Sequence, residues 1–446
     1  MVSLIARDRE RMRVKRYFDF ERHGTTYRKE TLAGVTTFLT MAYIIIVNPA
    51  ILEAAGMPKG PSMVATILSA AFGTVVMGLY ARRPFAIAPY MGENAFIAFT
   101  VVKVMGYSWQ AALGAVFVAG VLFTLLTVLK VRSWLAEALP KSLKFSFAVG
   151  IGLFLTFIGL NETGIVRLGV PGAPVSLGNL AEARALLALF CLFVIVLMTI
   201  RRIRGAIVTG VLGTTFLSFL FNVTPAPVRW IGFPPDVRPL LLKLDLSATL
   251  SPSFFPIILT IFVMAFVDTV GTLIGLSARA GLLDEKGNLP GIEKPMLADA
   301  LATTVAPLLG TTTTGAFIES AAGIEEGGRT GFTSLVVAFL FLLSLFFAPL
   351  LTSVPPHAYG AALIVIGSFM IAPVTKIDFH DPTELIPAFL TISLISFTYN
   401  IAVGMTAGII SYPLLKVFSG RGREVPAGLW VLAVLSLTFY IFYPYQ

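Results

Sequence analysis

Long runs of apolar residues follow one another along most of this 446-residue chain, separated by short polar connections. About 20 consecutive apolar residues cross the hydrocarbon core of a bilayer as a helix. The runs therefore predict an all-α, polytopic membrane protein with about 14 transmembrane spans. A further apolar stretch, 427–443, would be an additional span or a helix at the membrane surface. The expected spans lie near residues 31–48, 62–80, 86–104, 109–130, 142–159, 183–200, 205–222, 254–277, 295–310, 314–324, 331–351, 359–374, 383–398 and 400–417.

Two of these spans are interrupted by polar residues, glycine and proline. The first, 86–104, contains Pro89, which favours an extended conformation at the residue before it. The second begins with four threonines at 311–314 and is too short to cross as a helix. Irregular backbone at membrane depth is tolerated only where protein or a watery cavity satisfies it. We therefore expect the third and tenth spans to be broken, each a short extended strand followed by a half-helix.

The two interrupted segments occupy the third place in each half of the chain, which indicates an internal repeat. An odd number of spans per half gives inverted repeats, and interrupted segments at matching places indicate a binding site at the midplane of a transporter. The expected divisions are a basic cytoplasmic tail at 1–29, a first seven-span repeat at 30–222, an external linker at 223–253, a second seven-span repeat at 254–418 and a C-terminal apolar segment at 419–446.

The positions of the basic residues indicate an orientation. With 14 spans and a cytoplasmic N-terminus, all but seven of the 33 Lys and Arg residues fall on the cytoplasmic side. This asymmetry is what the positive-inside tendency predicts. It also explains the net charge of +9 without a nucleic-acid partner, and it favours a multi-pass protein of the cell (inner or plasma) membrane. The seven basic residues expected outside are Lys59, Lys103, Arg167, Arg184, Arg229, Arg238 and Lys243.

The composition excludes several other classes of protein. Charged residues make up 13% of the chain, whereas soluble domains carry about 25%. The single cysteine, Cys191, cannot form an intramolecular disulfide, and the three histidines are scattered in expected loops. We therefore expect no metal site, no cofactor and no catalytic triad. A membrane-embedded enzyme would need such a group beside its acids.

Asp268 and Glu319 are the main candidate functional residues, because both lie inside apolar stretches. A carboxylate at membrane depth is costly and normally faces a pore, a pocket or a partner. No Lys or Arg lies within either stretch to pair with it. A buried carboxylate can accept hydrogen bonds from N–H groups of a solute, and burial also favours its protonated form. The two acids are therefore expected to bind substrate and to couple its movement to protons.

Five further residues near the interruptions are candidates for substrate binding. Asn94 can donate and accept hydrogen bonds at once, which suits the edge of a heterocycle, and the hydroxyls of Thr314 and Ser320 can do the same. The alternative for all three is satisfaction of the broken backbone. Phe96 and Phe317 lie beside these polar positions, so their rings are the best placed to stack on a flat ligand.

Several stretches resemble the AzgA-like purine permeases of the nucleobase–cation symporter superfamily, which carry hypoxanthine, guanine and adenine. The resemblance runs from about residue 17 to the C-terminus. It is carried by the stretches 30–44 with Asn48-Pro49, 88–95, 268–275 and, most strongly, 318–331.

This resemblance implies 14 spans in two inverted repeats of seven, divided into core and gate domains, with the purine bound between the third, eighth and tenth spans and moved by proton symport. Matched by motif, the acids of the eighth and tenth spans fall on Asp268 and Glu319, and the polar residue of the third falls on Asn94. Family members often carry a second acid where this chain has Ala265. The preferred purine and the proton stoichiometry stay open, as does the oligomeric state, for which a homodimer is one option.

Three other functions remain as alternatives. An anion carrier of the sulfate-permease type would keep the fold, but it needs cations or bare helix N-termini near its substrate rather than two carboxylates. A membrane-embedded enzyme is disfavoured by the lack of His or Cys beside the acids. A channel is also disfavoured, and accumulation of solute against a gradient would exclude it.

Overall fold

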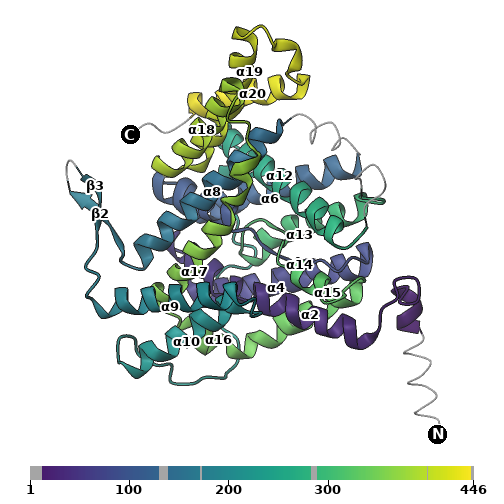
Figure 1. The fold of residues 1–446 in the computed structure, drawn as a ribbon, viewed down its shortest axis with the longest axis vertical. Coiled ribbons are helices and arrows are strands. Elements are labelled where there is room, and N and C mark those ends of the chain that lie inside the picture. Colours follow the sequence, from purple (N-terminus) through teal and green to yellow (C-terminus); the bar gives the residue numbers. More distant parts are fainter. Residues whose placement is uncertain (1–12, 130–138, 171–172, 283–288, 399, 443–446) are drawn as a thin grey trace.

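The computed structural model describes residues 13–129, 139–170, 173–282, 289–398 and 400–442. Within these residues, nine helical stretches are long and apolar enough to cross a membrane, and three shorter apolar helices accompany them. The chain is thus a helical membrane protein whose polar connections lie between the ends of its helices (Figure 1).

Short connections join most of the helices. The described residues contain four short β-strands. The first half contains α2 (Tyr27–Met41), α3 (Ile44–Ala54), α4 (Lys59–Val76), the π-helical η1 (Met77–Ala81), β1 (Ile87–Pro89), α5 (Met91–Ala95), the π-helical η2 (Phe96–Val104), α6 (Trp109–Val128), α8 (Lys141–Glu162), β2 (Val166–Val170), β3 (Ala173–Leu177), α9 (Ala183–Ile200) and α10 (Ala206–Leu220).

The second half has no counterpart of the β2–β3 hairpin among its described residues. It contains α11 (Leu246–Thr249), the 3₁₀ turn η3 (Pro252–Phe254), α12 (Phe255–Arg279), α13 (Glu293–Leu309), β4 (Thr314–Ala316), α14 (Ser320–Glu325), α15 (Gly331–Ser344), η4 (Leu345–Phe347), α16 (Ala348–Thr352), α17 (Pro356–Phe369), η5 (Ala372–Lys376), α18 (Pro382–Phe397), α19 (Ile401–Phe418), η6 (Gly422–Glu424) and α20 (Ala427–Phe442).

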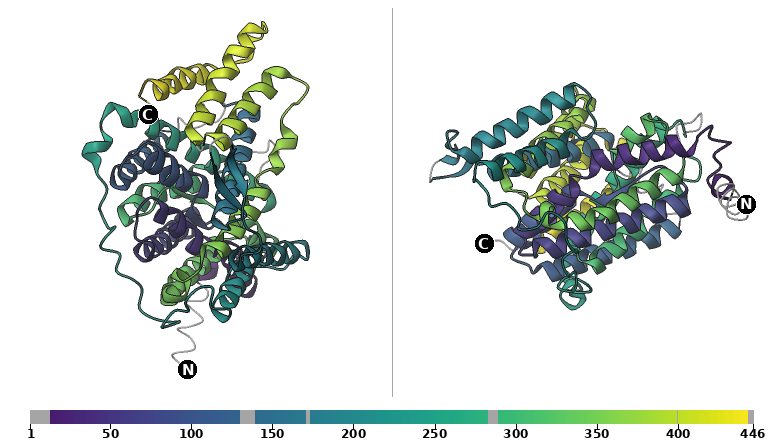
Figure 2. Two further views of the ribbon diagram at one scale, coloured as in Figure 1. Left: turned by 90° about the vertical axis from the view of Figure 1, so that its left-hand side faces the viewer. Right: turned by 90° about the horizontal axis from the view of Figure 1, so that it is seen from below.

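The helices pack into two groups. The strand group comprises the elements from α2 to α6 and from α12 to α15, which pack around β1 and β4. The flanking group comprises α8, α9, α10, α17, α18 and α19. The helix α20 packs against α19 of the flanking group and α12 of the strand group, so it joins the two. It lies with α18 and α19 at one end of the longest axis (Figure 1 and Figure 2).

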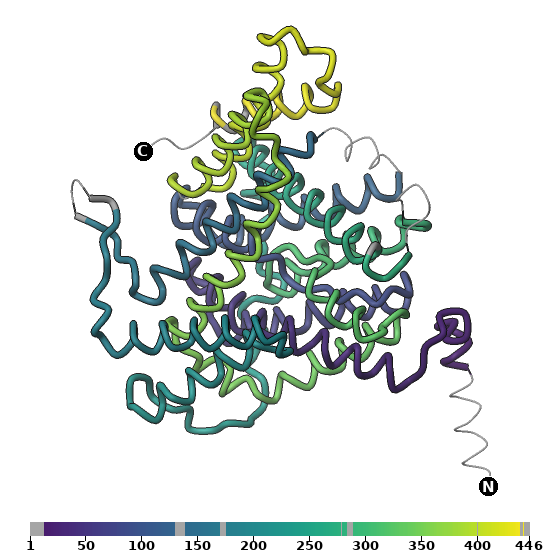
Figure 3. The backbone as a smooth tube through the Cα atoms, viewed as in Figure 1, coloured from purple at the N-terminus to yellow at the C-terminus, as the bar shows by residue number. Residues whose placement is uncertain are grey.

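The β2–β3 hairpin and the N-terminal residues lie on opposite sides of the helices. The hairpin projects at the left of the tube view, and the purple residues near position 13 lie at the right (Figure 3). The loop that follows α8 and the segment that precedes α2 therefore lie on different sides of the helices.

The strands β1 and β4 pair with each other at the centre of the strand group. They run antiparallel, with Ala88 opposite Gly315, and all their residues are buried. The pairing continues beyond the strands, because the Tyr90 amide donates to the Thr313 carbonyl at 3.0 Å and the Phe317 amide donates to the Ala86 carbonyl at 2.9 Å. Each segment thus satisfies the backbone polar groups of the other where water is scarce.

Glycines set the distance between α8 and α17, the most closely packed helices of the flanking group. A Cβ atom on Gly159 would lie 2.5 Å from the carbonyl oxygen of Gly360, and one on Gly367 would lie 2.3 Å from that of Gly152. Two small residues spaced by seven positions on each helix let the backbones approach closely, as in other membrane helix pairs.

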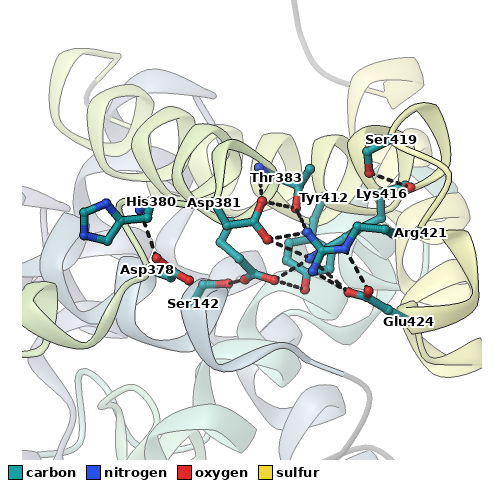
Figure 4. A network of polar contacts seen from close by, with 11 residues as sticks. Ser142, Asp378, His380, Asp381, Thr383, Tyr412, Lys416, Ser419, Arg421 and Glu424 are labelled. Carbon is teal, nitrogen blue, oxygen red and sulfur yellow. Dashed lines mark hydrogen bonds and ion pairs between the residues drawn. The ribbon is translucent and has the colours of Figure 1, made fainter.

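A polar network fastens one end of the flanking group (Figure 4). Lys416 of α19 is 1% exposed, and its Nζ lies 2.8 Å from Glu384 and 3.5 Å from Asp381. Glu384 also accepts a hydrogen bond from Ser142 of α8 at 2.5 Å. Arg421 binds Asp381 at 2.6 Å, and hydrogen bonds from Thr383 and Arg421 hold the pKa of Asp381 well below its usual range.

We expect Lys416→Met to lower the stability of the detergent-solubilised protein by about 2 kcal/mol, because the change leaves the partly buried Glu384 without its cation, whereas Asp381 keeps Arg421. The measurement is the thermal midpoint by intrinsic fluorescence. Arg423→Met, which removes an exposed charge from the same segment, is the matched control. Equal midpoints for the two variants would contradict a stabilising role for the network.

The depressed pKa of Asp381 in the folded protein gives the network a pH dependence. The contribution of Asp381 to the stability of the folded protein is present at neutral pH, and it is lost only as the pH falls through that lower pKa.

Candidate functional site

A chamber of about 930 Å³ lies between the strand group and the flanking group. The strand group contributes residues from α2, from the β1–α5 and β4–α14 segments, and from α12. The flanking group contributes α17 and the turn between α9 and α10. The lining includes Thr40, Tyr43, Tyr90, Met91, Gly92, Asp268, Thr272, Phe317, Ile318, Glu319, Ile366, Phe369 and Met370.

Asp268 lies on the chamber wall, on α12. The helix forms because its sequence is apolar apart from a few small polar residues, and packing of α12 against α6 and α14 fixes its rotation. Among the described residues, none forms a hydrogen bond or an ion pair with the Asp268 side chain. Its carboxylate is therefore free to accept hydrogen bonds from a molecule in the chamber.

Glu319 lines the same chamber immediately before α14. The hydroxyl of Tyr43, at the junction of α2 and α3, donates a hydrogen bond to its Oε1. The Thr40 hydroxyl donates to the backbone carbonyl of Glu319 at 3.3 Å. These two contacts orient the Glu319 carboxyl, and its second oxygen remains for a ligand.

An aromatic pair stands beside the two acids. The rings of Tyr90 and Phe317 are nearly parallel, with an interplanar angle of 13° and centroids 6.5 Å apart. Both residues line the chamber. Gly315 makes the arrangement feasible, because a Cβ atom there would lie 2.2 Å from the Tyr90 ring. The pair offers flat apolar surface to a planar ligand.

The other four candidate residues lie behind the chamber lining, fully buried. Asn94 donates to the side chain of Asn48 and accepts from the hydroxyl of Thr312, so it links α5 to α3 and to the segment before β4. The Ser320 hydroxyl accepts from the Ala86 amide at 3.0 Å. Thr314 lies in β4, and its carbonyl accepts from Thr303 at 2.6 Å. Phe96 packs in the hydrophobic core.

Asp299 of α13 is a buried acid that sequence reasoning missed. Its Oδ1 accepts from the Ala316 amide at 2.7 Å, and its Oδ2 accepts from the Thr269 hydroxyl at 2.5 Å. It thereby ties β4 to α12 directly beside Asp268 and Phe317. The signal was present, since Asp299 is an acid inside the expected span 295–310.

The chamber rim carries charged residues that are mostly paired. Arg279 binds Glu325 at 2.7 Å, and Arg204 of the α9–α10 turn forms an ion pair with Glu326. The arginines are exposed, so the chamber meets the surface here. These two arginines are neutralised, whereas Arg202 of the same turn also lines the rim and is exposed, with no ion pair among the described residues.

No group of three or more His, Cys, Asp or Glu side chains that could hold a metal ion occurs within the described part of the chain. The chamber instead presents hydrogen-bond acceptors and aromatic faces within a helical membrane fold. Such a site suits reversible binding of a small, flat, N–H-bearing solute. Fold and site together define a multi-pass membrane transporter.

Comparison with known proteins identifies the family. Residues 28–407 match the model of the Permease family (Xan_ur_permease), and the chain belongs to this family. It is 38% identical to the adenine permease AdeP of Escherichia coli (strain K12), over 96% of each chain. It is 39% identical to the guanine/hypoxanthine permease PbuG of Bacillus subtilis (strain 168), over 96% of this chain and 100% of that protein. The resemblance carried by the sequence motifs is thereby confirmed.

Solved structures show the same fold at low sequence identity. The transmembrane domain of the cyanobacterial bicarbonate transporter BicA superposes with a TM-score of 0.63, covering 85% of this chain and 97% of that domain. The two sequences are 17% identical, so this likeness concerns the fold alone.

Proposed function

We propose that this protein is a secondary active transporter that imports purine nucleobases by proton symport. The observation that carries the proposal is the chamber itself, in which Asp268, Glu319 and the Tyr90–Phe317 pair lie together. Purines are flat and bear N–H donors, so the rings would stack on the base while the two carboxyls accept from its edge. The names of the relatives AdeP and PbuG support the same substrate class.

In this proposal the seven candidate binding residues divide into two kinds. Asp268, Glu319 and Phe317 touch the substrate, and the two acids also carry protons. The other four, Asn94, Thr314, Ser320 and Phe96, position the strand–helix segments from behind the lining.

We also propose a topology for the chain in the membrane. The fold would comprise 14 spans in two inverted repeats, 30–222 and 254–418, with the strand group as core domain and the flanking group as gate domain. The N-terminal tail would be cytoplasmic in the cell membrane, and α20 would follow the second repeat. Alternating access would come from movement of one group against the other.

The chamber would then be open to the cytoplasm, because its exposed rim lies at the α9–α10 turn, where basic residues gather. The opposite end is closed by contacts between the groups. Lys59, at the start of α4, donates to the Val354 carbonyl at 3.3 Å and lies 5.8 Å from the ring centre of Tyr359 on α17. Tyr359 donates to Glu162 of α8 at 3.0 Å. Phe369 lines the chamber, and Tyr359 lies about 15 Å from it along α17, so the contacts of Tyr359 lie well away from the chamber lining.

The function can be tested by uptake of radiolabelled adenine, guanine and hypoxanthine into cells that lack their own purine carriers. We expect saturable accumulation of at least one base, and its loss when a protonophore collapses the gradient. Bicarbonate and sulfate serve as competitors, because an anion carrier of the same fold would respond to them. Accumulation of either anion without purine uptake would replace this proposal with the anion carrier.

A further inference from the structure

Glu93 of α5 is a further acid at membrane depth, and the chamber does not explain its role. Its side chain is 0% exposed. Neither carboxyl oxygen has a hydrogen-bond partner in another described residue. The preceding residues Met91 and Gly92 line the chamber, whereas Glu93 is absent from the lining. It therefore lies behind the chamber wall.

Among the described residues, the elements packed against α5 place no cation beside Glu93. The segment α5 packs against α3, α8, α12 and η2. The charged residues of α3, α8 and η2 lie at the ends of these elements, away from the middle of the membrane. Three titratable groups interact electrostatically with Glu93: Tyr90 beside α5, Asp268 of α12 and Asp299 of α13. Both carboxyl groups would repel a charge on Glu93.

An ionised carboxylate without a partner or water costs several kcal/mol or more in such surroundings. Other buried acids of this protein avoid that cost through donors. Glu30, also 0% exposed, accepts from the Thr330 hydroxyl at 2.9 Å and from the Thr333 hydroxyl at 2.5 Å. Glu93 has no such donor among the described residues, so its surroundings favour the protonated form.

We propose that Glu93 is a proton-carrying residue of the transport cycle. In the conformation described here it is protonated and shielded from the chamber. Movement of α5 against α8, which Gly92 meets at Ile151, would give water access to the carboxyl. The O–H bond then breaks, and the proton passes to water on the side to which the chamber is open. This inference rests on the proposed proton symport and adds to it a residue distinct from the two chamber acids.

The test uses the purified full-length protein in liposomes that contain a fluorescent pH indicator, with the radiolabelled purine that the wild type accumulates best. Three quantities are measured: accumulation driven by a pH gradient, substrate-dependent proton influx, and exchange of labelled for unlabelled purine at equal pH. The variants are Glu93→Gln and Glu93→Asp. Glu53→Gln, which changes an acid at the end of α3, is the control.

We expect Glu93→Gln to lose proton influx and to lower accumulation roughly 5- to 150-fold, the range of typical coupling between two sites. Exchange should persist, because it requires no net proton movement, and Glu93→Asp should restore influx and accumulation. Wild-type proton influx in Glu93→Gln would overturn the inference. So would loss of exchange in a folded Glu93→Gln protein, since that pattern marks a structural role. Failure of the wild type to take up any purine would instead reject the proposed function, and this inference with it.

Discussion

Replacing Asp268 with asparagine, or Glu319 with glutamine, is expected to reduce purine uptake about 100-fold or more while leaving the protein folded in the membrane. Each change keeps the size of the side chain but replaces a charged acceptor by an amide. Hydrogen bonds to charged groups contribute about 1.5–3 kcal/mol each, which corresponds to roughly 10- to 150-fold in affinity. Loss of the proton site adds to this effect, since an amide cannot take up a proton at neutral pH.

The measurement is initial uptake rate against concentration, normalised to protein in the membrane. Glu293→Gln is the matched control, because Glu293 is an exposed acid in the first turn of α13, away from the chamber. Asp268→Glu distinguishes charge from shape. If either neutral variant transported at the wild-type rate, that acid would have no part in binding or coupling.

Gly367→Leu is expected to prevent recovery of folded protein. A Cβ atom at this position would lie 2.1 Å from the Thr156 hydroxyl and 2.3 Å from the Gly152 carbonyl. The second contact is with backbone, so α8 and α17 would have to separate. Overpacking costs about 1–3 kcal/mol when side chains can adjust. A forced helix separation exceeds that range and opens the flanking group.

The readout is size-exclusion chromatography of a fluorescent fusion extracted in mild detergent. Gly213→Leu is the matched control, because a Cβ atom at Gly213 of α10 meets nothing within 4 Å. We expect a single sharp peak for the control and aggregated or missing protein for Gly367→Leu. Equal peaks would show that the α8–α17 contact is looser than described.

The helical membrane fold was predictable because its signal is local. Long apolar runs specify helices in lipid wherever they occur, and polar or proline-containing interruptions mark the places where a helix cannot continue. The interruptions predicted in the spans 86–104 and 314–324 were recognised in this way, and the short strands β1 and β4 lie at these places. The exact number of spans depends on helix ends and on shorter helices such as α18, which hydropathy resolves poorly.

The details of the chamber were less predictable because they depend on contacts between distant segments. Tyr43 and Tyr90 carry no distinctive local pattern, yet one binds Glu319 and the other lies parallel to Phe317. The polar residues Asn94 and Ser320 looked equally suited to a ligand or to broken backbone. The structure gives them protein partners, because the direction of a side chain follows from packing rather than from its chemistry.

The pairing of β1 with β4 has a consequence for how the protein is made. The Ala86 carbonyl receives its hydrogen bond from Phe317, a residue synthesised more than two hundred positions later. Until the ribosome has delivered that segment, Ile87 of the early strand has its partner Thr74, but the Ala86 carbonyl lacks the Phe317 amide and the Tyr90 amide lacks the Thr313 carbonyl. The N-terminal half should therefore stay incompletely inserted, or rest on a chaperone or insertase, until late in translation. Fragments that end before residue 314 should consequently be targets for membrane quality control.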